Sequence, residues 1–219
     1  MSLTTEFLSD PKEFLQTNVV IVPEETDAAV GDPKVFSFEI KEHGSNSGLL
    51  VPAGKDAPKF IRAYYLPWKV GVATTMDLGD EADFFFTSHL TNCRFSILAD
   101  DPKKPKVAHV SGTGNATKRN QWEKDAGFVD DSSKGRARRL SVSGGYDPEM
   151  HKKVKDHMYL GQDRANKSSA FVFGQRVKDV WEFHAQIVKG SLSNPSALDL
   201  ETDLTILKHP NVDGMLATL

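Results

Sequence analysis

Cys93 is the only cysteine of the chain, and His109 follows it sixteen positions later. A thiol becomes an effective nucleophile when a nearby imidazole removes its proton, so this pair could perform thiolate chemistry. The polar, proline-containing stretch from Asp100 to Pro105 is typical of a loop that joins two strands. If those strands pair, Cys93 and His109 can lie on one face of a sheet. The alternatives are that Cys93 is an inert buried side chain and that His109 is an ordinary strand histidine with satisfied polar atoms.

The elements expected to position this pair are mainly strands. Short runs rich in aromatic and β-branched residues, separated by Gly, Pro or Asp, are typical of sheet strands. They predict strands over residues 19–22, 35–40, 49–51, 60–66, 83–86, 93–98, 106–110, 169–177, 180–188 and 203–208.

Helices are expected to be few. Asp10 precedes a proline and is predicted to cap a short helix. Met150, Val154 and Met158 are spaced four apart and predict a longer helix with one apolar side. We therefore predict an α+β fold, with residues 1–219 forming a single domain that has a β-sandwich-like core and a few flanking helices.

The composition is that of a soluble globular protein. Its 219 residues suffice for one well-buried domain, and contents of 39% hydrophobic and 26% charged residues argue against disorder. The net charge of -3 gives no reason to expect nucleic acid as a partner. The sequence contains no secretory signal and no run of about 18 to 20 apolar residues, so we expect a cytoplasmic protein without a membrane partner. A lone cysteine also suits a reducing cytosol.

Three short motifs surround Cys93 in a fixed order. They are Leu66-Pro67-Trp68-Lys69-x-Gly71, then Phe85-Phe86-Thr87-x-x-Leu90-x-x-Cys93, then Val107-x-His109. Together they resemble the Burkholderia lethal factor-like family of glutamine deamidase toxins. That family is related to the catalytic domains of cytotoxic necrotizing factors and to chemoreceptor glutamine deamidases. The resemblance implies a cysteine-dependent protein glutamine deamidase, which hydrolyses a Gln side chain to Glu with release of ammonia.

The resemblance also implies roles for individual residues. Cys93 would be the nucleophile, His109 its general base, and Thr87 the residue that orients the imidazole. The backbone N–H of Cys93 and one from the preceding turn would bind the oxyanion of the tetrahedral intermediate. A catalytic Cys93 is expected to be alkylated rapidly below pH 7 and more slowly in His109→Ala, whereas an inert buried Cys93 is expected to react slowly in both proteins.

Trp68, Thr91 and Asn92 are predicted to form the rim of the substrate site. Trp68 can equally be a core aromatic residue. Thr91 and Asn92 stand where the family has a pair of small residues that includes glycine, and Asn tolerates a tight turn better than most residues. His89, four residues before Cys93, is a further candidate that the family pattern does not require.

Partners and delivery are expected from the resemblance alone. A host translation factor or a small GTPase would be the protein substrate, and the chain would act as a monomeric bacterial toxin or virulence effector delivered into the host cytosol. No cofactor is expected, and no metal, because the seven histidines are scattered and form no zinc-binding pattern. Two other functions stay open: a transglutaminase or other thiol acyl-transfer enzyme on the same scaffold, and a non-catalytic binding module.

Overall fold

The structure, a computed structural model, describes residues 1–98, 101–128, 137–142, 157–160, 168–189, 199–200 and 205–207. The helices in these ranges are α1 (Leu3–Ser9), α2 (Pro11–Thr17), α3 (Glu24–Val30) and α4 (Ala116–Asp125). None of these described helices has the length and apolar character needed to cross a membrane.

The predicted start of the short helix is confirmed. The Asp10 side chain accepts hydrogen bonds from the backbone N–H groups of Lys12 and Glu13, at 3.1 and 3.0 Å, and Pro11 occupies the first turn. A carboxylate at this position satisfies N–H groups that have no partner inside the helix.

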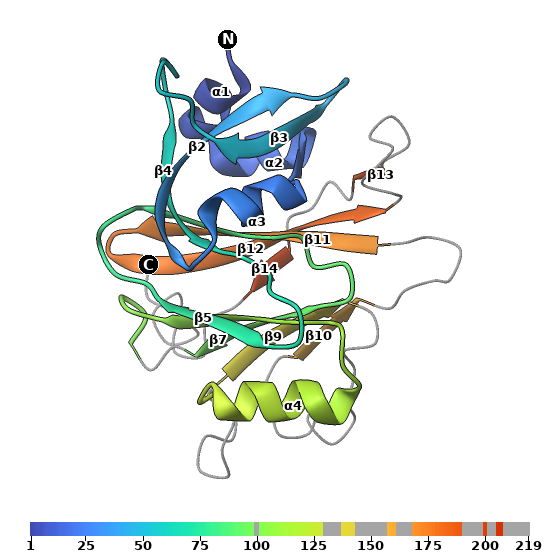
Figure 1. The fold of residues 1–219 in the computed structure, drawn as a ribbon. Coiled ribbons are helices and arrows are strands. Elements are labelled where there is room, and N and C mark those ends of the chain that lie inside the picture. The colour runs from blue at the N-terminus through green and yellow to red at the C-terminus, as the bar shows by residue number, and fades with distance from the viewer. Residues whose placement is uncertain are drawn as a thin grey trace.

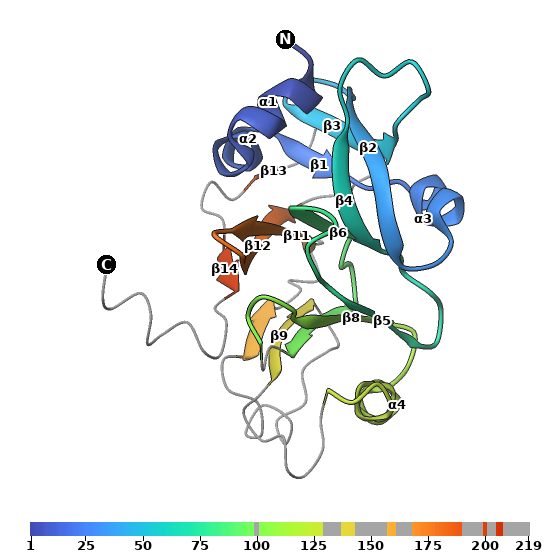
Figure 2. The same ribbon diagram turned by 90° about the vertical axis from the view of Figure 1, so that its left-hand side faces the viewer.

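The described strands form a nine-stranded and a five-stranded sheet (Figures 1 and 2). The larger sheet has the order β1-β3-β2-β4-β6-β11-β12-β13, and β14 also pairs with β12. Its strands are β1 (Val19–Ile21), β2 (Lys34–Glu42), β3 (Ser47–Pro52), β4 (Ile61–Leu66), β6 (Phe84–Thr87), β11 (Ser168–Val177), β12 (Val180–Lys189), β13 (Asp199–Leu200) and β14 (Thr205–Leu207). The smaller sheet has the order β10-β9-β7-β8-β5, with strands β5 (Ala73–Asp77), β7 (Arg94–Leu98), β8 (Lys106–Val110), β9 (Ala137–Val142) and β10 (His157–Leu160).

A hydrophobic core joins the two sheets. Tyr64 and Phe85 of the larger sheet pack in one cluster with Phe95 and Val107 of the smaller sheet, and all four are buried. A second cluster lies where α1 and α2 meet the larger sheet, and its members include Phe7, Phe14, Phe38 and Phe86. The Phe-rich strands are therefore buried on both faces, which is the environment that aromatic residues favour in sheets.

The hairpin of β11 and β12 turns on a pair of residues in the left-handed region. Lys178 has a φ of 48° and Asp179 a φ of 68°. Two successive positive φ values are typical of the type I′ turn, whose twist matches that of the flanking strands. The two strands predicted at 169–177 and 180–188 are thereby confirmed, with one extra residue at the outer end of each.

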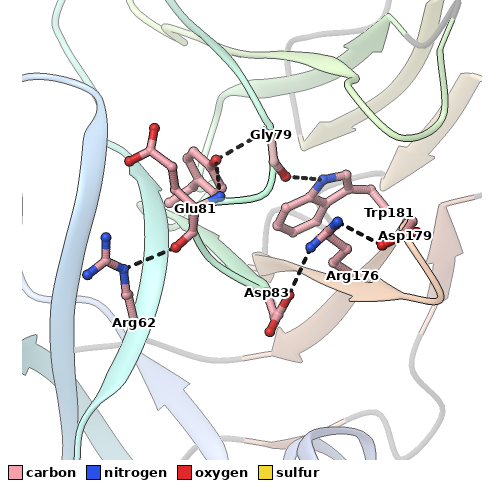
Figure 3. Close-up of polar contacts among 8 residues, drawn as sticks. Arg62, Gly79, Glu81, Asp83, Arg176, Asp179 and Trp181 are labelled. Atoms are coloured by element: carbon pink, nitrogen blue, oxygen red, sulfur yellow. Dashed lines mark hydrogen bonds and ion pairs between the residues drawn. The ribbon is translucent and has the colours of Figure 1, made fainter.

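The segment that precedes β6 is fastened to this hairpin (Figure 3). The Trp181 indole N–H donates to the Gly79 carbonyl at 3.3 Å. The Arg176 guanidinium contacts Asp83 at 3.4 Å and Asp179 at 2.8 Å. These contacts set the position from which β6 runs towards Thr87.

The sequence-based predictions match most strands but miss other elements. α1, α3, α4, β5, β9 and β13 were not expected, because α4 has little apolar periodicity, β9 begins in a basic run and the other four are short. The predicted helix through Met158 is wrong at its described end: Met158 lies in β10, which pairs with β9 in parallel. Met150 and Val154 lie outside the described residues. The aromatic and apolar run around Met158 pairs as a strand, so tertiary context overrides the four-residue spacing. The α+β class is confirmed, whereas the β-sandwich-like core and the single domain stay predictions.

Candidate active site

The two strands that flank residues 99–105 pair as the sequence suggests. β7 and β8 are antiparallel, with Phe95 opposite His109 and Arg94 opposite Val110. Side chains alternate along a strand, so Cys93, Phe95 and His109 share one face. Cys93 and Phe95 belong to the core between the sheets, whereas Val110 packs on the opposite face, beside α4. Cys93 immediately precedes β7, and it packs in the same buried cluster as Phe95 and Val107, on the face of the sheet that carries His109.

Thr87 fixes the tautomer of His109. Its hydroxyl donates to the Leu66 carbonyl at 2.6 Å and lies 2.8 Å from His109 Nδ1. A hydroxyl has a single proton to donate, so towards His109 it must accept, and Nδ1 carries the ring proton. Nε2 therefore holds the lone pair that a general base needs.

His109 is neutral and its base nitrogen is unoccupied. The side chain is 1% exposed, and burial lowers its pKa to about 3. Nε2 has no hydrogen-bond partner among the described residues, the Cys93 thiol included. The resting site therefore holds a neutral imidazole and not an ion pair.

The thiol is protonated in the resting protein. Cys93 is 5% exposed, and burial raises its pKa above the ordinary value. The backbone N–H groups of Gly112, Asn92 and Thr91 act in the opposite direction, as does the charge of Arg119. Desolvation of the thiolate therefore outweighs these favourable contacts, and a thiol with a raised pKa is expected to be alkylated slowly below pH 7.

Cys93 opens onto a cleft of about 340 Å³. The cleft is lined by Val22, Glu24, Asp27, Trp68, Ser88, His89, Thr91, Asn92, Cys93, Gly112 and Thr113. The structure thus brings the predicted rim residues and the thiol to one cavity. Thr87 and His109 do not line it, so a ligand in the cleft meets the sulfur before the imidazole. The roles assigned to these residues stay predictions.

One wall of the cleft is held by Asp27, which sequence reasoning missed. Its Oδ1 accepts from the Ser88 hydroxyl at 2.5 Å and from the Tyr65 hydroxyl at 2.7 Å. Ser88 in turn accepts from the backbone N–H of Trp68 at 2.8 Å. Burial raises the pKa of Asp27, although these hydrogen bonds favour its ionised form. The acidic run Glu24-Glu25 after a proline could have revealed α3, which carries Asp27. No local signal in the sequence reveals the contact between Asp27 and Ser88.

His89 lines the cleft but is held by a structural contact. Its Nε2 lies 2.9 Å from the Val20 carbonyl and donates to it, and its ring packs against Phe171. Burial lowers the pKa of His89 to about 4, so the ring is neutral at physiological pH.

Nine chains among the solved structures match the fold of this chain. The fold is similar to the C-terminal domain of CNFy from Yersinia pseudotuberculosis. The match has a TM-score of 0.46 and 8% sequence identity, and covers 80% of this chain and 71% of that chain. No protein-family model and no curated protein matches the sequence. At this TM-score and identity the likeness supports no conclusion about activity.

Proposed function

We propose that the chain is a cysteine-dependent amidohydrolase that converts a protein glutamine to glutamate. The observation that carries the proposal is the hydrogen bond between Thr87 Oγ1 and His109 Nδ1, because it leaves Nε2 as a buried base on the sheet face that also carries Cys93.

The reaction begins with transfer of the thiol proton to His109 Nε2 and attack of the sulfur on the carboxamide carbon. The tetrahedral intermediate collapses as the imidazolium returns its proton to the departing ammonia. A thioester on Cys93 remains. Water, deprotonated by the same Nε2, then attacks the thioester and releases glutamate with the free thiol.

Two features of the resting site require a rearrangement before attack. The thiol and Nε2 are not hydrogen-bonded. Burial raises the pKa of Cys93 and lowers that of His109, so both groups are neutral. Catalytic hydrogen bonds are often loose in free enzymes and tighten when substrate binds. A glutamine side chain that fills the cleft would exclude water and press Cys93 towards His109.

Transglutamination is the second candidate, and a particular feature of the cleft favours it. Glu24 and Asp27 line the cavity that contains the thiol. Carboxylates at that position would attract a primary amine, which is cationic at neutral pH. The two reactions share the thioester and differ only in whether water or an amine attacks it.

The resemblance of the motifs around Cys93 supports a host protein as substrate, such as a translation factor or a small GTPase. It also supports action as a delivered toxin. Surface loops outside these motifs would select which host protein is bound.

Peptide mass spectrometry of treated lysates tests the proposal. Eukaryotic and bacterial lysates are incubated with wild type or Cys93→Ser, with and without a small primary amine. We expect glutamine to become glutamate only with wild type, and to do so even when the amine is present. Adducts of the amine as the main product would favour transglutamination. No conversion in either lysate would overturn the enzymatic proposal and favour a binding module.

A further inference from the structure

Two loops meet at the sulfur, and their contact is tight. The first loop contains residues 91–93 and the second residues 111–113. A Cβ atom added to Gly112 would overlap the carbonyl oxygen of Asn92 and lie 2.6 Å from its carbonyl carbon. The Asn92 side-chain amide also donates to the Gly112 carbonyl at 3.3 Å. Only glycine fits at this position, so the two backbones are held against each other next to Cys93.

Arg119 contacts both of these loops from α4. It belongs to α4, which is capped by Asn115, and only 4% of the side chain is exposed. Its Nη1 donates to the Asn92 carbonyl at 3.4 Å and to the Gly112 carbonyl at 3.5 Å. A single guanidinium nitrogen thus spans the contact between the loops.

The bond to the Asn92 carbonyl has a consequence for the following N–H. In a trans peptide the carbonyl and the next N–H point in opposite directions. A guanidinium that holds the Asn92 carbonyl towards α4 therefore directs the Cys93 N–H away from α4. This N–H is the oxyanion donor that the proposed function requires.

Arg119 also supplies a charge that the cleft lacks. Among the described residues that line it, the ionisable side chains other than the thiol are Glu24, Asp27 and His89. The first two are acidic, and His89 is neutral because burial lowers its pKa. The positive charge of Arg119 is therefore the one that favours the Cys93 thiolate.

We propose that Arg119 is a positioning residue for the proposed nucleophile: it fixes the peptide that carries the Cys93 N–H and stabilises the thiolate from behind the cleft. This inference rests on the proposed function, because Arg119 can assist catalysis only if Cys93 is the nucleophile. Its effect on the thiol can be measured without any substrate.

The test is the rate of Cys93 alkylation by iodoacetamide at pH 8 in wild type, Arg119→Gln, Arg119→Lys and Lys124→Gln. Gln keeps an N–H donor but loses the charge, Lys keeps the charge, and Lys124 is an exposed cation of the same helix. We expect roughly threefold to tenfold slower alkylation in Arg119→Gln, since one pKa unit changes the thiolate fraction tenfold. Arg119→Lys should stay within about twofold of wild type, and Lys124→Gln should match it.

A folded Arg119→Gln that reacts as fast as wild type would overturn the inference. If circular dichroism shows that Arg119→Gln does not fold, Arg119→Lys decides: alkylation about tenfold slower than wild type would overturn it. The lysate assay separates this result from the proposed function. If alkylation of Arg119→Gln is slower but wild type converts no glutamine, the role of Arg119 stands and the deamidase proposal fails. If wild type converts glutamine but alkylation of Arg119→Gln is unchanged, the deamidase proposal stands and the role of Arg119 fails.

Discussion

Thr87 and His109 are joined by a 2.8 Å contact between Oγ1 and Nδ1, and the Thr87 proton is already committed to the Leu66 carbonyl at 2.6 Å. This geometry determines which nitrogen of His109 is basic. It also makes Thr87 testable separately from the two residues proposed to react.

Thr87→Val should slow glutamine conversion while leaving the fold intact. The change removes the acceptor for Nδ1–H and leaves a buried donor unsatisfied, at a cost of about 1 to 3 kcal/mol. If that cost falls on the transition state, the rate decreases roughly tenfold to a hundredfold. Thr87→Ser keeps the hydroxyl and should retain most of the activity. Equal rates for Thr87→Val and wild type would exclude an orienting role.

The free energy of unfolding should decrease more steeply with falling pH than protonation of the carboxylates alone would cause. Burial lowers the pKa of His109 to about 3 and that of His89 to about 4, whereas both are near 6.5 when unfolded. The unfolded chain therefore binds more protons below about pH 6.5, and the free energy of unfolding decreases from there towards about pH 4. Urea midpoints at pH 7.5, 6 and 5 measure this. His109→Asn should give a shallower decrease, and identical slopes for the two proteins would contradict the burial argument.

Asp27→Ala should destabilise the protein and weaken the cleft wall. It leaves the buried hydroxyls of Tyr65 and Ser88 without their shared acceptor, at about 1 to 3 kcal/mol for each unsatisfied group. Asp27→Asn keeps an oxygen acceptor and is the matched control. We expect a lower urea midpoint and a higher KM for Asp27→Ala, because Ser88 also holds the Trp68 backbone. A midpoint equal to that of Asp27→Asn would show that the acceptor is dispensable.

The buried ion pair of Arg94 and Glu123 should be needed for stability. Both side chains are fully buried, and Glu123 also accepts from the Ser96 hydroxyl. Removing one partner of such a pair typically costs about 3 to 5 kcal/mol. Glu123→Ala should therefore lower the free energy of unfolding by about that amount in urea titrations. Asp125→Ala, an exposed acidic residue of the same helix, should change it little. Equal midpoints for both variants would contradict this role.

The strands were predictable because their sequences carry strong local signals. The pairing of β7 with β8 follows from two apolar runs around a polar, proline-containing loop, and this pairing brings Cys93 and His109 to one face. The turn at Lys178 and Asp179 was also marked in the sequence, since polar residues there separate two apolar runs.

The rest of the candidate site depends on contacts that no local pattern encodes. Asp27 of α3 lines the cleft and Arg119 of α4 contacts the loops beside it, and the partners of both residues are distant in sequence. The raised pKa of Cys93 likewise follows from tertiary burial. The sequence therefore indicated the groups that are proposed to react, whereas the residues that hold them and the charge state of the thiol required the fold.

The most direct measurement of the central claim is intact-mass spectrometry of the acid-quenched protein during conversion of a glutamine substrate found in the lysate assay. We predict a thioester adduct on Cys93, equal to the substrate minus ammonia, that forms in wild type and forms much more slowly in His109→Asn, because His109 accepts the thiol proton before the sulfur attacks. Formation of glutamate with Cys93 unmodified throughout, or at the same rate in Cys93→Ser, would contradict the account.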